Sequence, residues 1–185
     1  MARAAVQAYL LLALAGCSPV VDAKFSDVVV TRPDVAIPAA PTAGLTSVTF
    51  SFSMDSSKLG ASSNPAAQNQ IASAKLHEIS LTAKGGITDL SFIKTLHTIA
   101  YVPLRGSGAT SENQVEIADY ERSGTQPVGA VLTVPPPEPV DLLPLLRPTS
   151  TEQTKIVVVV NLDGELPMSA WKADVSMSLS IELHQ

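Results

Sequence analysis

The stretch Val175-Ser176-Met177-Ser178-Leu179-Ser180-Ile181-Glu182-Leu183 alternates strictly between apolar and polar side chains. A period of two residues is typical of a β-strand with one buried and one solvated face. The five apolar residues are predicted to face a core, and the serines and Glu182 to face solvent. The same alternation in Ser47–Met54 puts Val48, Phe50, Phe52 and Met54 on one face of a second strand.

More strands are expected along the chain, with turn-forming residues between them. They are predicted in Ile71–Ala83, His97–Tyr101, Gln114–Tyr120, Pro127–Val134 and Lys155–Leu162. The alternation slips between Leu76 and Ile79, which indicates a β-bulge at His77–Glu78. Four consecutive valines in Lys155–Leu162 favour a central strand covered on both faces, and Asp163–Gly164 favours a turn that returns the chain as a hairpin.

Two short helical turns are predicted, at Asp89–Ile93 and Asp141–Leu146, each opened by an aspartate that can cap it. The sequence has no amphipathic helix of ten residues. The predicted fold class is therefore all-β, an antiparallel immunoglobulin-like β-sandwich of seven to eight strands with two short helical turns. A small barrel would give a similar strand spacing and stays open as an alternative.

The first sixteen residues have the pattern of a secretory signal peptide. Arg3 is their one charge, and the apolar run Ala4–Ala15 is shorter than the roughly 20 residues that span a bilayer. The run ends in Leu14-Ala15-Gly16-Cys17, which resembles the lipobox of bacterial lipoproteins. An ordinary signal peptide cut near Ala15–Gly16 is the alternative.

The lipobox resemblance implies a diacylglyceryl group on Cys17, cleavage before it, and an acyl chain such as palmitate on the new N-terminus. Each buried CH₂ contributes about 0.8 kcal/mol, so two or three chains hold a protein on a membrane stably. Ser18 follows the cysteine. In enteric lipoproteins an Asp at this position favours retention in the inner membrane, so Ser18 favours the outer membrane. The expected location is thus the bacterial cell envelope.

The predicted domain organisation follows from these segments. Residues 1–16 are the signal peptide, and residues 17–43 are the lipid anchor and a proline-rich tether with a possible edge strand at 27–31. Residues 44–185 form the β-sandwich domain. From Leu76 onward the layout is similar to that of uncharacterised lipoproteins of Gram-negative bacteria, through Leu81-Thr82-Ala83, Asp89-Leu90-Ser91-Phe92 and Asp141-Leu142. That resemblance implies no activity.

Composition excludes several classes of function. The chain has 185 residues, of which 45% are hydrophobic and 16% charged, enough to form the core of one domain. Its formal net charge of −5 argues against nucleic-acid binding. Cys17 is the single cysteine, so neither an internal disulfide nor a multi-cysteine metal site is possible. Aromatic residues make up 4%, which is few for a stacking surface.

No cofactor, metal site or catalytic group is predicted. The three histidines, His77, His97 and His184, have no metal-site spacing along one element. Glu116 and Asp119 differ in strand parity and should lie on opposite faces, whereas Asp119 and Glu121 share a face, so a solvated strand edge is expected.

Three other segments contain residue types that could support chemistry. Gly106-Ser107-Gly108 lacks the elbow that activates a nucleophilic serine. Asn161–Glu165 offers oxygen ligands for calcium but is a common turn sequence. Trp171, the single tryptophan, is expected to fill the core and not to hold a ligand.

The predicted function is a non-catalytic binding or structural module of the envelope, anchored through Cys17 and not an enzyme. It would offer a protein partner the loops Asp55–Gln70 and Arg105–Asn113, or a sheet edge. The rival is a small-ligand carrier or hydrolase whose site assembles distant His and carboxylate residues, with His77, His97, Glu116 and Asp119 as first candidates. An abundant coat protein with no specific partner is a third interpretation.

Overall fold

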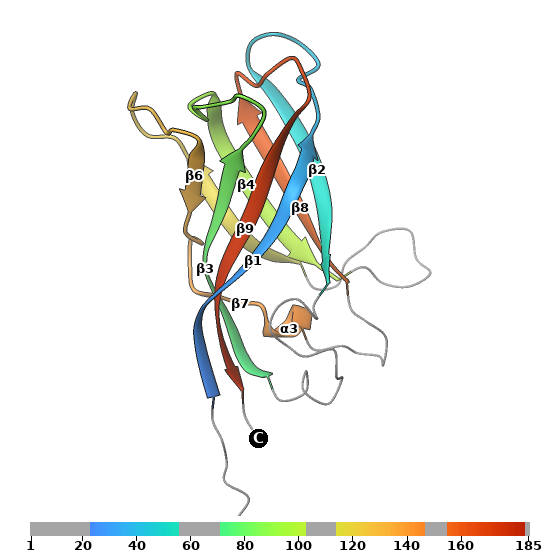
Figure 1. Cartoon of the computed structure of the whole chain (residues 1–185), viewed down its shortest axis with the longest axis vertical. Coiled ribbons are helices and arrows are strands. Elements are labelled where there is room, and N and C mark those ends of the chain that lie inside the picture. Colours follow the sequence, from blue (N-terminus) through green and yellow to red (C-terminus); the bar gives the residue numbers. More distant parts are fainter. Residues whose placement is uncertain (1–22, 56–70, 103–113, 147–154, 184–185) are drawn as a thin grey trace, which may run out of the picture.

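The computed structural model describes residues 23–55, 71–102, 114–146 and 155–183. Its elements are shown in Figure 1. In chain order they are β1 (Ala23–Ile37), β2 (Thr46–Asp55), β3 (Ile71–Ala83), β4 (Ile93–Tyr101), β5 (Val115–Glu121), β6 (Val131–Val134), β7 (Val140–Asp141), α3 (Leu143–Leu146), β8 (Lys155–Gly164) and β9 (Trp171–Leu183). In these residues no helix has the length and apolar character needed to span a bilayer.

The strands form two antiparallel sheets. The first sheet has the order β1-β9-β3-β6, with β7 also paired to β3, and the second has the order β2-β8-β4-β5. The pairing therefore alternates between the sheets. The first sheet holds the pairs β1·β9 and β3·β6, and the second holds β2·β8 and β4·β5. This is the arrangement of a jelly roll, in which a long series of antiparallel strand pairs is rolled into two facing sheets. The chain is thus an all-β sandwich, as predicted.

The finer prediction of an immunoglobulin-like order is not what the strands adopt. In immunoglobulin domains the first two strands lie together in one sheet. Here β1 and β2 lie in different sheets, and β1 pairs with the last strand, β9. Among the described residues there are nine strands, including the two-residue β7. Alternation along one strand reports which residues face the core, and it carries no information on which strands pair.

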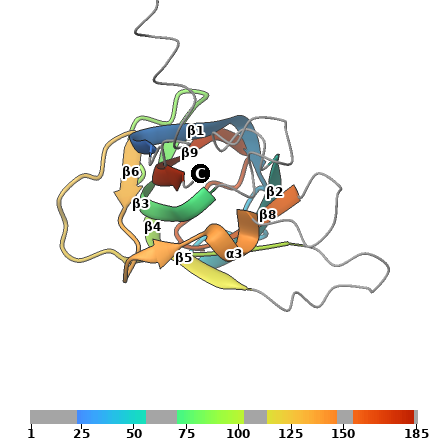
Figure 2. The same cartoon turned by 90° about the horizontal axis from the view of Figure 1, so that it is seen from below.

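Both sheets contribute to one apolar core, and the alternation that predicted it is confirmed. Val175, Met177, Leu179 and Ile181 of β9 are buried, as are Val48, Phe50 and Phe52 of β2. Figure 2 shows the strands of the two sheets surrounding a common interior. The largest fully buried side chains are Ile37, Ile71, Leu90, Ile93, Ile117, Leu142, Leu145, Ile156, Leu162 and Met177. One serine of β9 departs from the pattern, because Ser180 is buried as well.

The two aspartate-capped turns are present, but only one is helical. The Asp89 carboxylate accepts hydrogen bonds from the Ser91 amide at 3.0 Å and the Ser91 hydroxyl at 2.6 Å. The Ile93 amide donates to the Leu90 carbonyl and closes a non-helical turn. Asp141 accepts from the Leu143 amide at 2.9 Å, at the start of helix α3.

Strand β1 is longer than the predicted edge strand at 27–31. It runs from Ala23 to Ile37 and pairs with β9 along this length. Its register shifts between Arg32 and Val35, so that Pro33 sits where the ladder is already interrupted and its missing N–H costs little. The first sheet therefore begins at Ala23, within the segment expected to be a tether.

Strand β8 also differs from the prediction. It lies centrally, between β2 and β4, but of its four valines only Val158 and Val160 are buried, while Val157 and Val159 are half-buried on the outer face. The segment after Gly164 is not a hairpin return, because β9 belongs to the other sheet. Strand β4 begins at Ile93, before His97, and β6 begins at Val131.

The sandwich has two distinct ends (Figure 1). β1 begins and β9 finishes at the lower end of the view, beside α3. The upper end carries four connections, residues 38–45, 84–92, 122–130 and 165–170. Backbone hydrogen bonds join these connections to one another, from Ala40 to Pro167, from Leu90 to Gly129 and from Glu165 to Phe92. The upper end is therefore held together by the main chain itself.

Candidate functional site

A β-bulge in β5 brings together two carboxylates that the sequence assigned to opposite faces. Thr98 of β4 lies opposite Ala118, and the next residue, Ile99, lies opposite Glu116, so Ile117 is an extra residue in the ladder. Ile117 and Ala118 are both 0% exposed, whereas Glu116 and Asp119 are exposed. The prediction that Glu116 and Asp119 lie on opposite faces of the strand is therefore wrong, because the extra residue shifts the alternation by one position between them.

These carboxylates meet a histidine of the neighbouring strand. His97, on β4, lies directly opposite Asp119 of β5. Its Nδ1 atom is 3.6 Å from Glu116 Oε1 and 4.0 Å from Asp119 Oδ1. One ligand atom from each of the three side chains lies within 4.8 Å of the others. We call these three residues the His97 cluster.

The cluster lies on the outer face of the second sheet, at the end of a row of polar side chains. The strand register places Thr49, Asn161, His97 and Asp119 side by side across the four strands. Thr49 donates a hydrogen bond to Asn161 Oδ1 at 2.6 Å. The side chains of the cluster are 44–60% exposed, so the site is open to solvent.

Within the described residues, the cluster carries an uncompensated negative charge. Neither carboxylate has a Lys or Arg partner at ion-pair distance. Lys94 of β4 pairs with Glu165, and Arg122, which follows β5, donates to the carbonyls of Ser91 and Gln126. An imidazole beside two carboxylates is a set of groups that can bind a cation or move a proton.

The other candidates of the rival hypothesis do not join this cluster. His77 is exposed at the predicted bulge of β3, where the register shifts between Leu76 and Glu78, and it belongs to the first sheet. Glu121 is exposed on β5, opposite Thr95. Cys17, Ser107 and His184 lie outside the described residues.

The predicted turn Asn161–Glu165 does not gather its oxygen atoms. Asn161 accepts from Thr49, Asp163 accepts from Thr95, and Glu165 pairs with Lys94. These side chains are bound to separate neighbours, so the calcium alternative gains no support from their arrangement.

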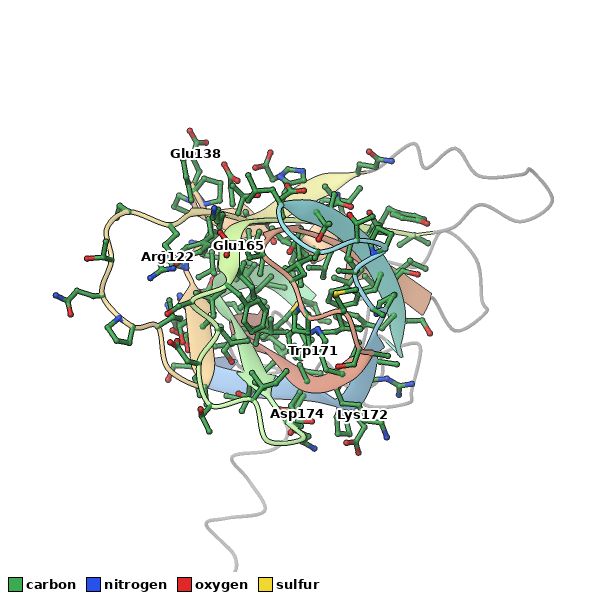
Figure 3. All side chains as sticks on the ribbon, turned by 90° about the horizontal axis from the view of Figure 1, so that it is seen from above. Arg122, Glu138, Glu165, Trp171, Lys172 and Asp174 are labelled. Atoms are coloured by element: carbon green, nitrogen blue, oxygen red, sulfur yellow. The ribbon has the colours of Figure 1, made fainter. Side chains whose placement is uncertain are left out.

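Trp171 is a core residue, as predicted. Its side chain is buried and packs edge-on against Phe92, with ring centroids 5.7 Å apart and an interplanar angle of 89°. Figure 3, which looks onto the upper end, labels it together with Arg122 and Glu165 from the surrounding connections.

A second charged group fixes the bulge in β1. Asp34 has a positive φ of 54°, and its amide donates to Asp174 Oδ1 at 2.9 Å. Lys84 pairs with Asp174 at 2.8 Å and with Asp34 at 3.2 Å. These hydrogen bonds raise the pKa of Lys84, and the bond from Lys84 lowers the pKa of Asp174. Their arrangement supports the backbone of β1 and not a ligand.

A groove lies where the free edges of the two sheets approach each other. Its walls are Arg32–Ala36 of β1 and Ser51–Ser53 of β2, with Val157 of β8, and its volume is about 480 Å³. Sequence reasoning could not find it, because it depends on which two strands stand at the edges.

Comparison with known proteins gives no family. No family model matches the chain, and no curated protein matches it. A chain in the structure of infectious bursal disease virus Gx strain is similar, with a TM-score of 0.29 and 11% identity over 92% of this chain and 45% of that one. For the Gt strain the TM-score is 0.23 with 10% identity, over 91% and 41%. This chain therefore spans less than half the length of either.

Proposed function

We propose that the protein is a lipoprotein of the bacterial cell envelope, in which the β-sandwich is a non-catalytic binding or structural module. The observation that carries the proposal is Leu14-Ala15-Gly16-Cys17 directly after the apolar run Ala4–Ala15. Cys17, the single cysteine of the chain, would receive the lipid. Two or three acyl chains would make the attachment stable, since one chain alone gives only marginal binding.

The position of β1 suggests how the anchored module would stand. β1 begins at Ala23, a few residues after Cys17 and at the lower end of the sandwich. A lipid on Cys17 would hold that end near the bilayer and direct the upper end away from it. The upper connections are joined by backbone hydrogen bonds, which would limit the conformational entropy that a partner must remove on binding.

The predicted contact loops Asp55–Gln70 and Arg105–Asn113 lie outside the described residues, except for Asp55 itself. The strands before them finish at Asp55 and Tyr101, on the same side as the start of β1. In the anchored protein these loops would therefore start close to the membrane. We assign the partner surface to the upper end for this reason.

A second candidate function has one observation in its favour. A hydrolase or ligand carrier needs a histidine and carboxylates in reach of each other, and His97, Glu116 and Asp119 meet that condition. The side chains of the cluster are 44–60% exposed on the outer face of the second sheet, and His77 lies on the first sheet. The non-catalytic proposal is therefore the better supported.

The lipid anchor is tested with the full chain expressed in a Gram-negative host. We expect the wild type to partition into detergent and to show the mass of a lipidated, processed chain, and we expect Cys17→Ala to show neither. Ser18→Ala is the matched control and should keep the lipid. A Cys17→Ala variant that still partitions into detergent would overturn the proposal.

The binding role is tested by crosslinking the tagged, lipidated protein in its native membrane, with mass spectrometry of the products. A single reproducible partner linked through the upper end would support a binding module. If the protein is abundant but no partner is crosslinked to it, the result would instead favour a coat protein without a specific partner.

A further inference from the structure

We propose that His97, Glu116 and Asp119 form a binding site for one divalent transition-metal ion, with Zn²⁺ as the best-matched ion. The site goes beyond the proposed envelope function and does not depend on the lipid anchor. It rests on three observations, namely the spacing of the ligand atoms, the charge around them and the chemical identity of the three groups.

The spacing is close to that of a tetrahedral zinc site. Zn–N and Zn–O bonds are about 2.0–2.2 Å, so adjacent ligand atoms lie about 3.3–3.6 Å apart around the ion. His97 Nδ1 and Glu116 Oε1 are already 3.6 Å apart, and His97 Nδ1 and Asp119 Oδ1 are 4.0 Å apart. All three atoms lie within 4.8 Å of one another, and small side-chain rotations would bring them to bonding distance. The exposed side chains have room for that movement.

The charge around the cluster favours a cation. Two carboxylates are held on one side of β5 by the bulge, and within the described residues no Lys or Arg neutralises them. An imidazole is a ligand in its neutral form, so it does not remove this charge when it binds a metal. A divalent ion would balance both carboxylates and would accept the imidazole nitrogen as a third ligand.

The strand pairing fixes the three positions before any ion binds. His97 is directly opposite Asp119, and Glu116 is opposite the residue two places further along β4, Ile99. The backbone of two paired strands therefore sets the spacing, and only side-chain rotamers must be ordered on binding.

The ligand set distinguishes between metals. Imidazole nitrogen suits zinc and other transition metals, whereas magnesium and calcium take oxygen ligands almost exclusively. Three protein ligands leave one position of a tetrahedral ion to water or to a group from a partner. We therefore expect selectivity for Zn²⁺ and Co²⁺ over Mg²⁺ and Ca²⁺.

The test is a titration of the full chain in detergent micelles, after treatment with a chelator and dialysis. ZnCl₂ is titrated by calorimetry, and CoCl₂ is followed by visible absorption. We expect one ion per chain and a loss of affinity of at least about tenfold in His97→Gln and Asp119→Asn, because even changes to groups behind a metal ligand cost about 10–100-fold. His77→Gln and His184→Gln are the matched controls and should bind like the wild type.

Three results would overturn the site. These are an absence of saturable Zn²⁺ binding to the wild type, unchanged binding in His97→Gln, and a loss of binding in either control histidine variant. Displacement of Zn²⁺ by millimolar Mg²⁺ or Ca²⁺ would also contradict it. His77, His97 and Asp119 are exposed or half-exposed, and circular dichroism with thermal unfolding verifies that each variant is folded.

The proposed metal site and the proposed lipid anchor can be tested independently of each other. The Cys17→Ala chain should bind Zn²⁺ with the wild-type affinity, because the ligands lie on β4 and β5. Loss of Zn²⁺ binding in Cys17→Ala would show that the measured binding depends on Cys17 and would overturn the proposed site.

Discussion

Glu116 and Asp119 present their carboxylates on the same face of β5, although three positions separate them in the sequence. In a regular strand, residues three apart lie on opposite faces. The bulge turns Ile117 and Ala118 both into the core and returns Asp119 to the outer face beside His97. The candidate metal site therefore depends on two buried apolar residues that carry no chemistry of their own.

The bulge makes Ala118 a core position, which gives the first prediction. Ala118→Asp places an unpaired charge at a site that is 0% exposed. We expect the free energy of unfolding to fall by about 2–5 kcal/mol, as for other buried unpaired charges. Chemical denaturation followed by circular dichroism measures the change. The control is Ser51→Asp on the exposed face of β2, opposite Val159, which should stay within about 0.5 kcal/mol of the wild type. Wild-type stability in Ala118→Asp would mean that Ala118 faces solvent and that β5 is regular.

The faces of individual strands could be predicted, because alternation is a local property. Ser47–Met54 and Val175–Leu183 show this, as the apolar residues of each that the structure describes are buried except for Leu183, which is half-buried. The pairing of β1 with β9 could not be predicted, since it joins the two ends of the described chain. Pro33 also made this segment look like a tether, because proline is unfavourable inside a regular strand. The structure accommodates Pro33 at a bulge, between Arg32 and Val35.

The candidate site was hidden for a related reason. His97 and Asp119 lie on different strands, and only the register between those strands places them opposite each other. A signal was nevertheless present in Glu116-Ile117-Ala118-Asp119, where two adjacent apolar residues stand between two acids. Such a pair interrupts a period of two and is compatible with a bulge.

The second prediction concerns Asp89, which joins two connections of the upper end. Its carboxylate accepts hydrogen bonds from the Ser91 amide and hydroxyl and from the amides of Val128 and Gly129. We expect Asp89→Ala to lower the melting temperature by several degrees and to make the connection 122–130 more sensitive to protease. Limited proteolysis and calorimetry measure these effects. Glu121→Gln, on the nearby end of β5, is the control and should leave both unchanged.

The same contacts make the contribution of Asp89 depend on pH. The hydrogen bond from the Ser91 hydroxyl, followed by those from the backbone amides, lowers the pKa of Asp89 in the folded state. A carboxyl with a lowered folded pKa contributes its stability above its unfolded pKa, near 3.9, and loses it as the pH falls through the folded value. The stability difference between wild type and Asp89→Asn should therefore be constant from pH 7 to about 5 and shrink below pH 4. A difference that stays constant down to pH 2 would contradict this assignment.

The third prediction compares two glycines. A Cβ on Gly164 would overlap the carbonyl oxygen of Phe92, whereas Gly86 has a φ of +92° but open space around it. Gly86→Ala should cost about 1–2 kcal/mol, the cost of a left-handed backbone with a side chain. Gly164→Ala should cost more, because the backbone bond from Glu165 to Phe92 must shift. Equal losses in denaturant unfolding would show that the close approach of Gly164 to Phe92 is relaxed at no cost.

The fourth prediction is a stabilising change in β4. Thr98 is 1% exposed, and its Oγ1 atom has no hydrogen-bond partner within the described residues. An unpaired buried hydroxyl costs about 1–3 kcal/mol relative to solvent, and valine has almost the same shape. We expect Thr98→Val to raise the free energy of unfolding by about 1 kcal/mol in urea titrations. Thr95→Val is the matched control on the same strand, and it should not stabilise the protein, because the Thr95 hydroxyl donates to Asp163 at 2.8 Å. If Thr98→Val were instead destabilising while Thr95→Val was neutral, the Thr98 hydroxyl would have a partner in the folded protein, such as a buried water.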